Sequence, residues 1–314
     1  MDNQKMEVKH SVFEFFKYKK EDRKYAQEPN AKKYWYIHAL SEIIGTVFLC
    51  LGLAGLSIYV KGQQIEHLFL IHNVIVGFFA GFIIVGLCLF IFLRYSCDLN
   101  PAVTLLRWMN GTNTTKYALM KIAMQIVGLV LAVGIIYGIG SATTNANDLV
   151  NNPIQALKST EKLFENFQPI SHNAKLVTGG FLIFFIELVM TAILLFPIFS
   201  PNINNKYRDL MILFIISMSV WMGILGGTAA INPVRGLAQQ LPTLVFQNNL
   251  LANKQILESV IIGTVAMVLG DTLAPVFYLF VQGITQKYVN PFIVNTIKFK
   301  NNRNEHMRDF SDEQ

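Results

Sequence analysis

The sequence predicts an all-α membrane protein in which six transmembrane helices and two half-helices form an inverted repeat. Three observations lead to this fold class. Hydrophobic residues make up 53% of the chain and charged residues only 15%, whereas soluble domains average about 25% charged residues. The charged residues gather in residues 1–34 and 286–314, at the two ends of the chain. The tripeptide Asn100-Pro101-Ala102 returns as Asn232-Pro233-Val234, each time shortly after a long apolar segment.

Six apolar segments are each long enough to cross a membrane, which takes about 20 predominantly apolar residues. They cover approximately residues 37–60, 69–93, 117–140, 176–198, 209–227 and 257–283. An even number of spans places both ends of the chain on the same side. Lys and Arg are frequent just before the first span, and the positive-inside rule then favours the cytoplasm. We therefore expect a multi-pass protein of the cell membrane with both termini in the cytoplasm.

Each Asn-Pro tripeptide predicts the start of a short helix. Asn is a preferred N-cap residue, and Pro suits the first helical position because it needs no backbone donor there. The first helix is expected from Asn100 to Trp108, a length of about 13 Å against a hydrocarbon core of about 30 Å. The second is expected from Asn232 to about Phe246, with a kink or an early end at Pro242. Both helices would therefore reach only part of the way across the membrane.

The chain divides into a channel domain between two tails. The N-terminal tail, residues 1–34, is expected to include a short amphipathic helix on the inner surface. Three spans and a half-helix occur twice, and because three is odd the second copy is inverted. Inverted repeats with broken helices indicate a permeation site near the membrane midplane. The predicted parts are the tails 1–34 and 285–314 and a channel domain 35–284, made of repeats 35–140 and 176–284 joined by a polar outer loop 141–175.

Two stretches of the sequence resemble the signatures of a known family. The segment Asp98 to Leu105 is similar to the first signature of the major intrinsic proteins, the aquaporins and aquaglyceroporins, and Gly227 to Arg235 is similar to the second. The resemblance extends over residues 35–283. It implies the aquaporin-like fold and a passive channel for small neutral solutes, glycerol-like polyols and/or water, that excludes ions and protons. It also implies a homotetramer with one pore per chain. No metal-ligand spacing links Cys50, Cys88 and Cys97, so we expect no metal, and we expect no cofactor.

The resemblance implies a role for each signature residue. The side-chain amides of Asn100 and Asn232 would donate hydrogen bonds into the pore, and the two positive helix ends would repel cations. Glu42 in the first span and Glu187 in the fourth match family positions that hold the backbone before each half-helix. Removing either Glu is expected to cost the folded channel before it changes selectivity.

The narrow outer filter would contain Arg235, which donates hydrogen bonds to the solute and adds to cation exclusion. Spacing from the two signatures places Ala80, Val220 and Ala229 at the other filter walls, and a shift by one residue offers Ser219 instead of Val220. These side chains are small or medium in size. We therefore expect a wide, mostly apolar filter that admits glycerol, and also urea, rather than water alone.

Two alternatives to a passive channel follow from other residues. Asp271 lies inside the sixth span and must be paired or protonated there. It is expected to bond to Thr272 or to a neighbouring helix, or else to serve a proton-linked transporter. Bulky Phe78, Phe79 and Phe82 near the filter leave a structural membrane protein with a closed pore as the second alternative.

The remaining charges indicate neither nucleic acid nor enzymatic activity. The net charge is +6, but the basic residues of the N-terminal tail alternate with acidic ones and precede a span. No nucleophile, base and orienting group occur together in the sequence. Asp98 stands where many relatives have His, and its role is open. Arg94 and Lys121 are expected near the inner membrane face, where their long side chains extend to the headgroups.

Overall fold

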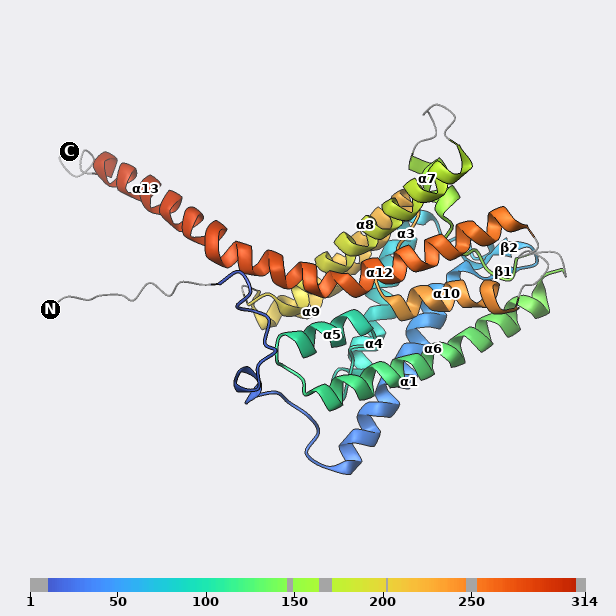
Figure 1. The fold of residues 1–314 in the computed structure, drawn as a ribbon, viewed down its shortest axis with the longest axis horizontal. Coiled ribbons are helices and arrows are strands. Elements are labelled where there is room, and N and C mark those ends of the chain that lie inside the picture. Colours follow the sequence, from blue (N-terminus) through green and yellow to red (C-terminus); the bar gives the residue numbers. More distant parts are fainter. Residues whose placement is uncertain (1–10, 146–148, 164–170, 202, 247–252, 309–314) are drawn as a thin grey trace.

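The computed structural model describes residues 11–145, 149–163, 171–201, 203–246 and 253–308. These residues form a bundle of helices with one short β-hairpin (Figure 1). Six of the helical segments are long and apolar enough to cross a membrane, which confirms the predicted spans. The elements that build them are α1 (Lys32–Leu53), the segment α3 (Asn73–Phe78), η3 (Phe79–Val85) and α4 (Gly86–Phe92), then α6 (Thr115–Thr143), α8 (His172–Phe199), α9 (Asn205–Gly226) and α12 (Lys254–Ile284).

Local sequence signals explain where several spans begin and end. The side chains of Thr114, Ser171, Asn204 and Asn253 each accept a hydrogen bond from the first turn of the helix that follows. Such N-cap residues satisfy backbone donors that have no partner within the helix. At the other end of α9, Gly227 has a φ of 83° and terminates the helix in the left-handed conformation that glycine tolerates.

The second span contains a seven-residue π-helix, η3, between α3 and α4. Two glycines of this span allow α9 to come close. A β-carbon at Gly81 in η3 would collide with Ser217 and the carbonyl of Leu213. A β-carbon at Gly77 in α3 would collide with Trp221. π-helical turns are rare and occur mostly at functional sites. Here the π-helix carries Ala80, one of the predicted filter residues.

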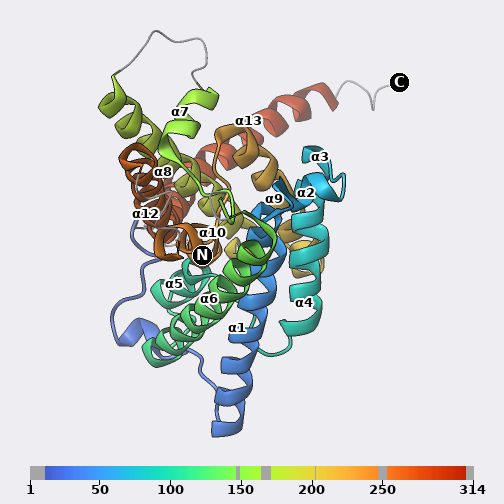
Figure 2. The same cartoon turned by 90° about the vertical axis from the view of Figure 1, so that its right-hand side faces the viewer.

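Two half-helices lie inside the bundle, α5 (Pro101–Met109) and α10 (Pro233–Phe246). Figure 2 shows α10 near the centre of the bundle, among the spans. The helix α10 continues through the buried Pro242 to Phe246, the end that the sequence predicts. The alternative of an early end at Pro242 is wrong, and the kink stays a prediction. Membrane helices tolerate proline where neighbouring groups bind the freed backbone. Pro242 removes the helical donor to the carbonyl of Ala238, and the side chain of Asn151 donates to the carbonyl of the adjacent Gln239.

One side of the bundle, here named the hairpin side, carries more structure than the predicted polar loop. Strands β1 (Tyr59–Val60) and β2 (Gln63–Gln64) form an antiparallel hairpin that leads into α2 (Ile65–Leu68). Helix α7 (Ala156–Leu163) lies within the segment 141–175 that was expected to be a loop. It packs so closely on α8 that a β-carbon at Gly179 would collide with the carbonyl of Ala156.

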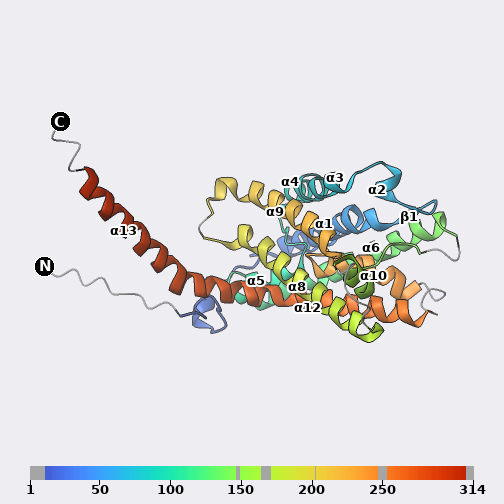
Figure 3. The same ribbon diagram turned by 90° about the horizontal axis from the view of Figure 1, so that it is seen from above.

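The opposite side, here named the terminal side, carries both ends of the described chain. Among residues 11–31 the one helical element is a short 3₁₀ helix, η1 (Glu21–Arg23), so the amphipathic helix expected within 1–34 is not formed in that part. Residues 1–10 of that expectation lie outside the described residues. Beyond α12, the elements η4 (Thr285–Val289) and α13 (Asn290–Arg308) project away from the bundle (Figure 3).

Candidate solute pore

The two Asn-Pro tripeptides start the two half-helices. Asn100 caps α5, and its Oδ1 accepts from the backbone N–H of Ala102 at 2.9 Å. In the same way Oδ1 of Asn232 accepts from the backbone N–H of Val234 at 3.1 Å. Pro101 and Pro233 are the first residues of their helices, where a missing N–H costs nothing.

Each of the two caps is also bonded to the loop of the other half. Nδ2 of Asn100 donates to the carbonyl of Ile231 at 2.9 Å, and Nδ2 of Asn232 donates to the carbonyl of Leu99 at 2.7 Å. Leu99 and Ile231 have φ values of 48° and 58°, a left-handed conformation that costs a non-glycine residue about 1–3 kcal/mol. These bonds place the two positive helix ends face to face. Each amide keeps a second N–H, because an Asn side chain has two amide hydrogens.

A buried carboxylate binds the loop before each half-helix. Oε1 and Oε2 of Glu42 accept from the backbone N–H groups of Asp98 at 3.0 Å and Leu99 at 2.9 Å. Glu187 accepts from those of Ala230 and Ile231, both at 2.8 Å. A hydroxyl four residues before each Asn adds a further bond to its Glu, from Ser96 in the first loop and Thr228 in the second. The two loops are therefore held by the same pattern of donors, counted back from each Asn.

A cavity of about 530 Å³ passes the two half-helix ends. Asn100, Asn232 and Arg235 line it, as do the three predicted small filter residues Ala80, Val220 and Ala229. The lining extends from residues of the hairpin side to residues of the terminal side. Examples are Gln64, His67 and Lys162 at the first end and Asp98, Arg107 and Arg208 at the second.

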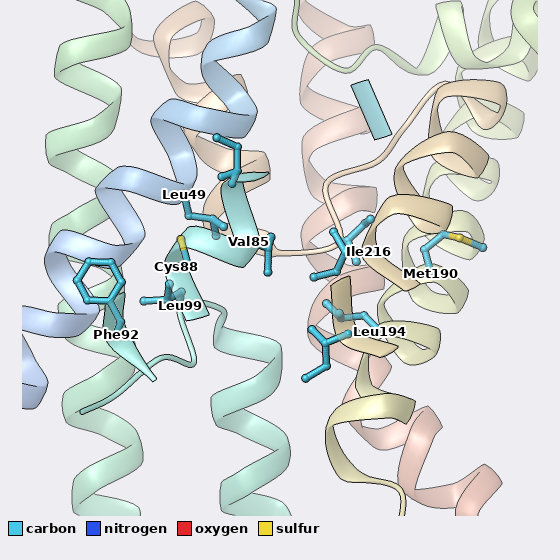
Figure 4. Packing of buried hydrophobic residues seen from close by; sticks show 11 residues of the cluster. Leu49, Val85, Cys88, Phe92, Leu99, Met190, Leu194 and Ile216 are labelled. Atoms are coloured by element: carbon cyan, nitrogen blue, oxygen red, sulfur yellow. The ribbon is translucent and has the colours of Figure 1, made fainter. Parts of the chain in front are cut away.

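A buried apolar cluster forms much of the remaining wall. Figure 4 shows the labelled members coming from α1, η3, α4, α8, α9 and the loop before α5. The cluster members that also line the cavity are Leu49, Val85, Cys88, Leu99, Leu194, Ile212, Ile216 and Ile231. The cavity thus has hydrogen-bonding groups at the half-helices and apolar side chains elsewhere, so a solute with both hydroxyl and methylene groups would match it.

Arg235 lies one turn into α10 beside the cavity. Its Nη1 donates to the carbonyl of Ala229 at 3.2 Å and its Nη2 to the carbonyl of Leu53 at 3.4 Å. A guanidinium has five N–H donors, so these two bonds fix the group and leave further donors for a solute.

The aromatic residues that could narrow the filter lie elsewhere. Among the described residues, the cavity lining includes Val220 but neither Ser219 nor Phe78, Phe79 or Phe82. The rings of Phe78 and Phe82 stack on each other with centroids 4.7 Å apart.

The structure corrects one expectation about charge and refines another. Lys121 does not extend to the headgroups: its side chain is 6% exposed and its Nζ lies 2.9 Å from Oδ2 of Asp98. Arg94 is exposed, and its place near the inner membrane face stays a prediction. Asp271 is fully buried and accepts from Thr191 on the neighbouring α8 rather than from Thr272. Lys121 escaped prediction because its partner is 23 residues away, a distance at which no local pattern indicates a contact.

An all-helical membrane protein with two facing half-helices and a cavity between them belongs to the class of membrane channels. The family model described as "Major intrinsic protein" matches residues 30–278, and the chain belongs to that family. It is therefore a multi-pass membrane channel for small neutral solutes and not an enzyme. A search of curated proteins finds no match.

The fold is also similar to that of a solved structure, the X-ray structure of the aquaglyceroporin from Plasmodium falciparum. The two chains are 16% identical in sequence and superpose with a TM-score of 0.51. The match covers 82% of this chain and 98% of the other. This similarity establishes the aquaporin fold of the chain.

Proposed function

We propose that the channel conducts glycerol-like polyols together with water and urea, and that it excludes ions and protons. The observation that carries this proposal is the cavity lining, which contains Arg235 together with the small or medium side chains of Ala80, Val220 and Ala229. Small side chains at these positions provide room for a three-carbon chain. The apolar cluster contacts its methylene groups, and the amides of the two half-helix caps donate to its hydroxyl groups.

Ion exclusion follows from the electrostatics of the two helix ends. Each N-terminus carries about half a positive charge, and Arg235 adds a full one. A cation entering the cavity loses hydration and meets like charge, which costs far more than the desolvation of a neutral hydroxyl compound. Asn100 and Asn232 are the donors proposed to replace the lost water at the midpoint, and Glu42 and Glu187 hold their loops in place.

The alternatives receive less support. Asp271, which motivated a proton-linked transporter, is fully buried and bonded to Thr191, and it is not among the described residues that line the cavity. The aromatic residues that motivated a closed pore are likewise outside that lining. We further propose that the channel lies in the cell membrane as a homotetramer with its terminal side in the cytoplasm, in line with the basic residues before the first span.

Stopped-flow light scattering of proteoliposomes tests the proposed selectivity. Vesicles are exposed to osmotic gradients of glycerol, urea and a larger polyol, with protein-free vesicles as the reference. We expect glycerol and urea to enter faster than in the reference vesicles. Water conduction without glycerol or urea flux would contradict the proposal. The Arg235→Val variant separates a narrow pore from a closed one, because a closed pore shows no response in either protein.

A further inference from the structure

Asp98 is an anionic side chain placed where a cation-excluding pore should not tolerate one. It lines the cavity and precedes the N-cap of α5 by two residues. The N-terminus of a helix carries about half a positive charge, so a free carboxylate beside it would more than cancel that charge. The terminal half of the cavity would then attract cations.

The structure shows how this carboxylate is neutralised. Oδ2 of Asp98 lies 2.9 Å from Nζ of Lys121 and also accepts from the hydroxyl of Thr104 at 3.0 Å. Oδ1 lies 2.9 Å from Nε of Arg107. Both oxygens are therefore engaged with cations, and neither is left to face a solute alone. The side chains of Asp98 and Lys121 are only 4% and 6% exposed, so solvent screens this pair weakly.

The same cluster includes the carboxylate that holds the first loop. Nε2 of Gln125 donates to Thr104 at 3.1 Å and to Oε2 of Glu42 at 2.8 Å. The cluster contains two carboxylates, Glu42 and Asp98, and two cations, Arg107 and Lys121. Its net charge is zero only while both cations are present.

We propose that Lys121 is a charge-selectivity residue, which acts through Asp98 to keep the terminal half of the cavity closed to cations. Arg107 supports it from a more exposed position, since its side chain is 34% exposed. This inference rests on the proposed exclusion of ions. Lys121 is not among the described residues that line the cavity, so its effect on a permeating ion is electrostatic and not steric.

The test compares glycerol flux and cation permeability in the same proteoliposomes. Cation permeability is read from a potential-sensitive dye under a K⁺ gradient. In Lys121→Met, the cluster of two carboxylates keeps only one cation, so a net negative charge remains near the N-terminus of α5. We expect cation permeability to rise about tenfold, equivalent to about 1.4 kcal/mol. Glycerol flux should stay close to that of the wild type, because the lining is unchanged.

A second substitution distinguishes lost charge from lost structure. In Asp98→Asn/Lys121→Met the negative charge is removed as well, and cation exclusion should return. Lys116→Met is the matched control, since it removes an exposed cation from the same helix, and it should behave like the wild type. Removing one member of a buried ion pair is strongly destabilising. Where Lys121→Met yields no folded channel, Lys121→Gln provides the same test, because glutamine also lacks the charge but keeps a hydrogen-bond donor for Asp98.

Each outcome decides one question. A cation-tight wild type with cation-tight Lys121→Met channels, or Lys121→Gln channels where the first variant does not fold, would overturn the inference and leave the proposed function intact. A double variant as leaky as Lys121→Met would also overturn it, because the leak would then come from altered packing. A wild type that itself conducts cations would instead refute the proposed ion exclusion.

Discussion

At the scale of single residues, two glutamates hold the ends of the pore loops. Glu42 and Glu187 each accept two backbone N–H groups and one hydroxyl at matching positions before the Asn. Leu99 and Ile231, which adopt left-handed conformations, each donate one of these bonds through the backbone N–H. The carboxylates thereby offset the cost of turning the two carbonyls toward the opposite half.

The substitution Glu187→Gln tests this role. The amide keeps one acceptor oxygen but directs an NH₂ group at a backbone donor, and each buried donor left without a partner costs about 1–3 kcal/mol. We expect a lower midpoint of thermal unfolding in detergent and a smaller yield of folded channel, with the selectivity of the surviving channels unchanged. The control is Glu161→Gln at an exposed position of α7. An unchanged midpoint for Glu187→Gln would show that the carboxylate is dispensable.

The width of the filter is tested by Ala80→Phe. Ala80 is 2% exposed and lines the cavity, so an aromatic ring there takes up space that a polyol would need. We expect glycerol flux to fall sharply while water flux persists, as measured by stopped-flow light scattering. Leu87→Phe serves as the control because Leu87 is 42% exposed on the second span, away from the lining. Equal losses of glycerol and water would indicate a blocked or misfolded pore.

At the scale of elements, the sequence predicts the helices whose positions are set by local sequence signals. Asn followed by Pro marks the starts of α5 and α10, and apolar length marks the six spans. The π-helix η3, the hairpin and α7 depend on packing against distant segments. For example, the backbone N–H of Leu157 in α7 donates to Ser259 on α12 at 2.9 Å. No sequence pattern within residues 141–175 indicates that contact.

The N-terminal segment is a second element that depends on distant contacts. Arg23 donates through Nη2 to the carbonyl of Trp108 at 2.5 Å and through Nε to the carbonyl of Lys17 at 2.7 Å, and its guanidinium lies 5.0 Å from the centroid of the Trp108 ring. The backbone N–H of Lys17 donates to the carbonyl of Met109 at 2.8 Å. Residues 11–31 therefore cap the last turn of α5, where a cation is favourable.

Arg23→Gln should loosen the end of α5. The loss of a cation and its hydrogen bonds at a helix C-terminus is worth about 0.3–2 kcal/mol. We expect faster amide hydrogen exchange around Met109 and a modestly lower unfolding midpoint. Lys24→Gln, at the exposed neighbouring residue, is the control. Identical exchange in the two variants would mean that the segment does not stabilise the half-helix.

At the scale of the whole molecule, the two inverted halves reach the same geometry with different residues. The first half balances its charges with Arg107 and Lys121, whereas the second has Arg235 near Glu187 and Asp271. The repeated Asn and Glu residues are readable from the sequence because they recur in order. The balancing charges are not, because each half obtains them from a different position on a different helix.

The proposed tetramer belongs to this scale as well. Many apolar side chains on the spans are exposed in the single chain, including Phe181 and Phe185 on α8 and Leu119 and Val130 on α6. Contacts between copies and with lipid would cover such faces. We expect native mass spectrometry from detergent to give a species with four times the 35.5 kDa mass of the chain. An active channel that is monomeric in the membrane would contradict this expectation.

The central claim is that a neutral polyol passes between Asn100 and Asn232, whereas ions and protons do not pass. The most direct test records glycerol-driven swelling and internal pH in the same proteoliposomes, with a pH-sensitive dye inside and a proton gradient imposed. The account predicts glycerol entry well above that of protein-free vesicles, with proton entry no faster than in those vesicles. Glycerol entry at the protein-free rate, or proton entry that grows with the amount of protein, would contradict it.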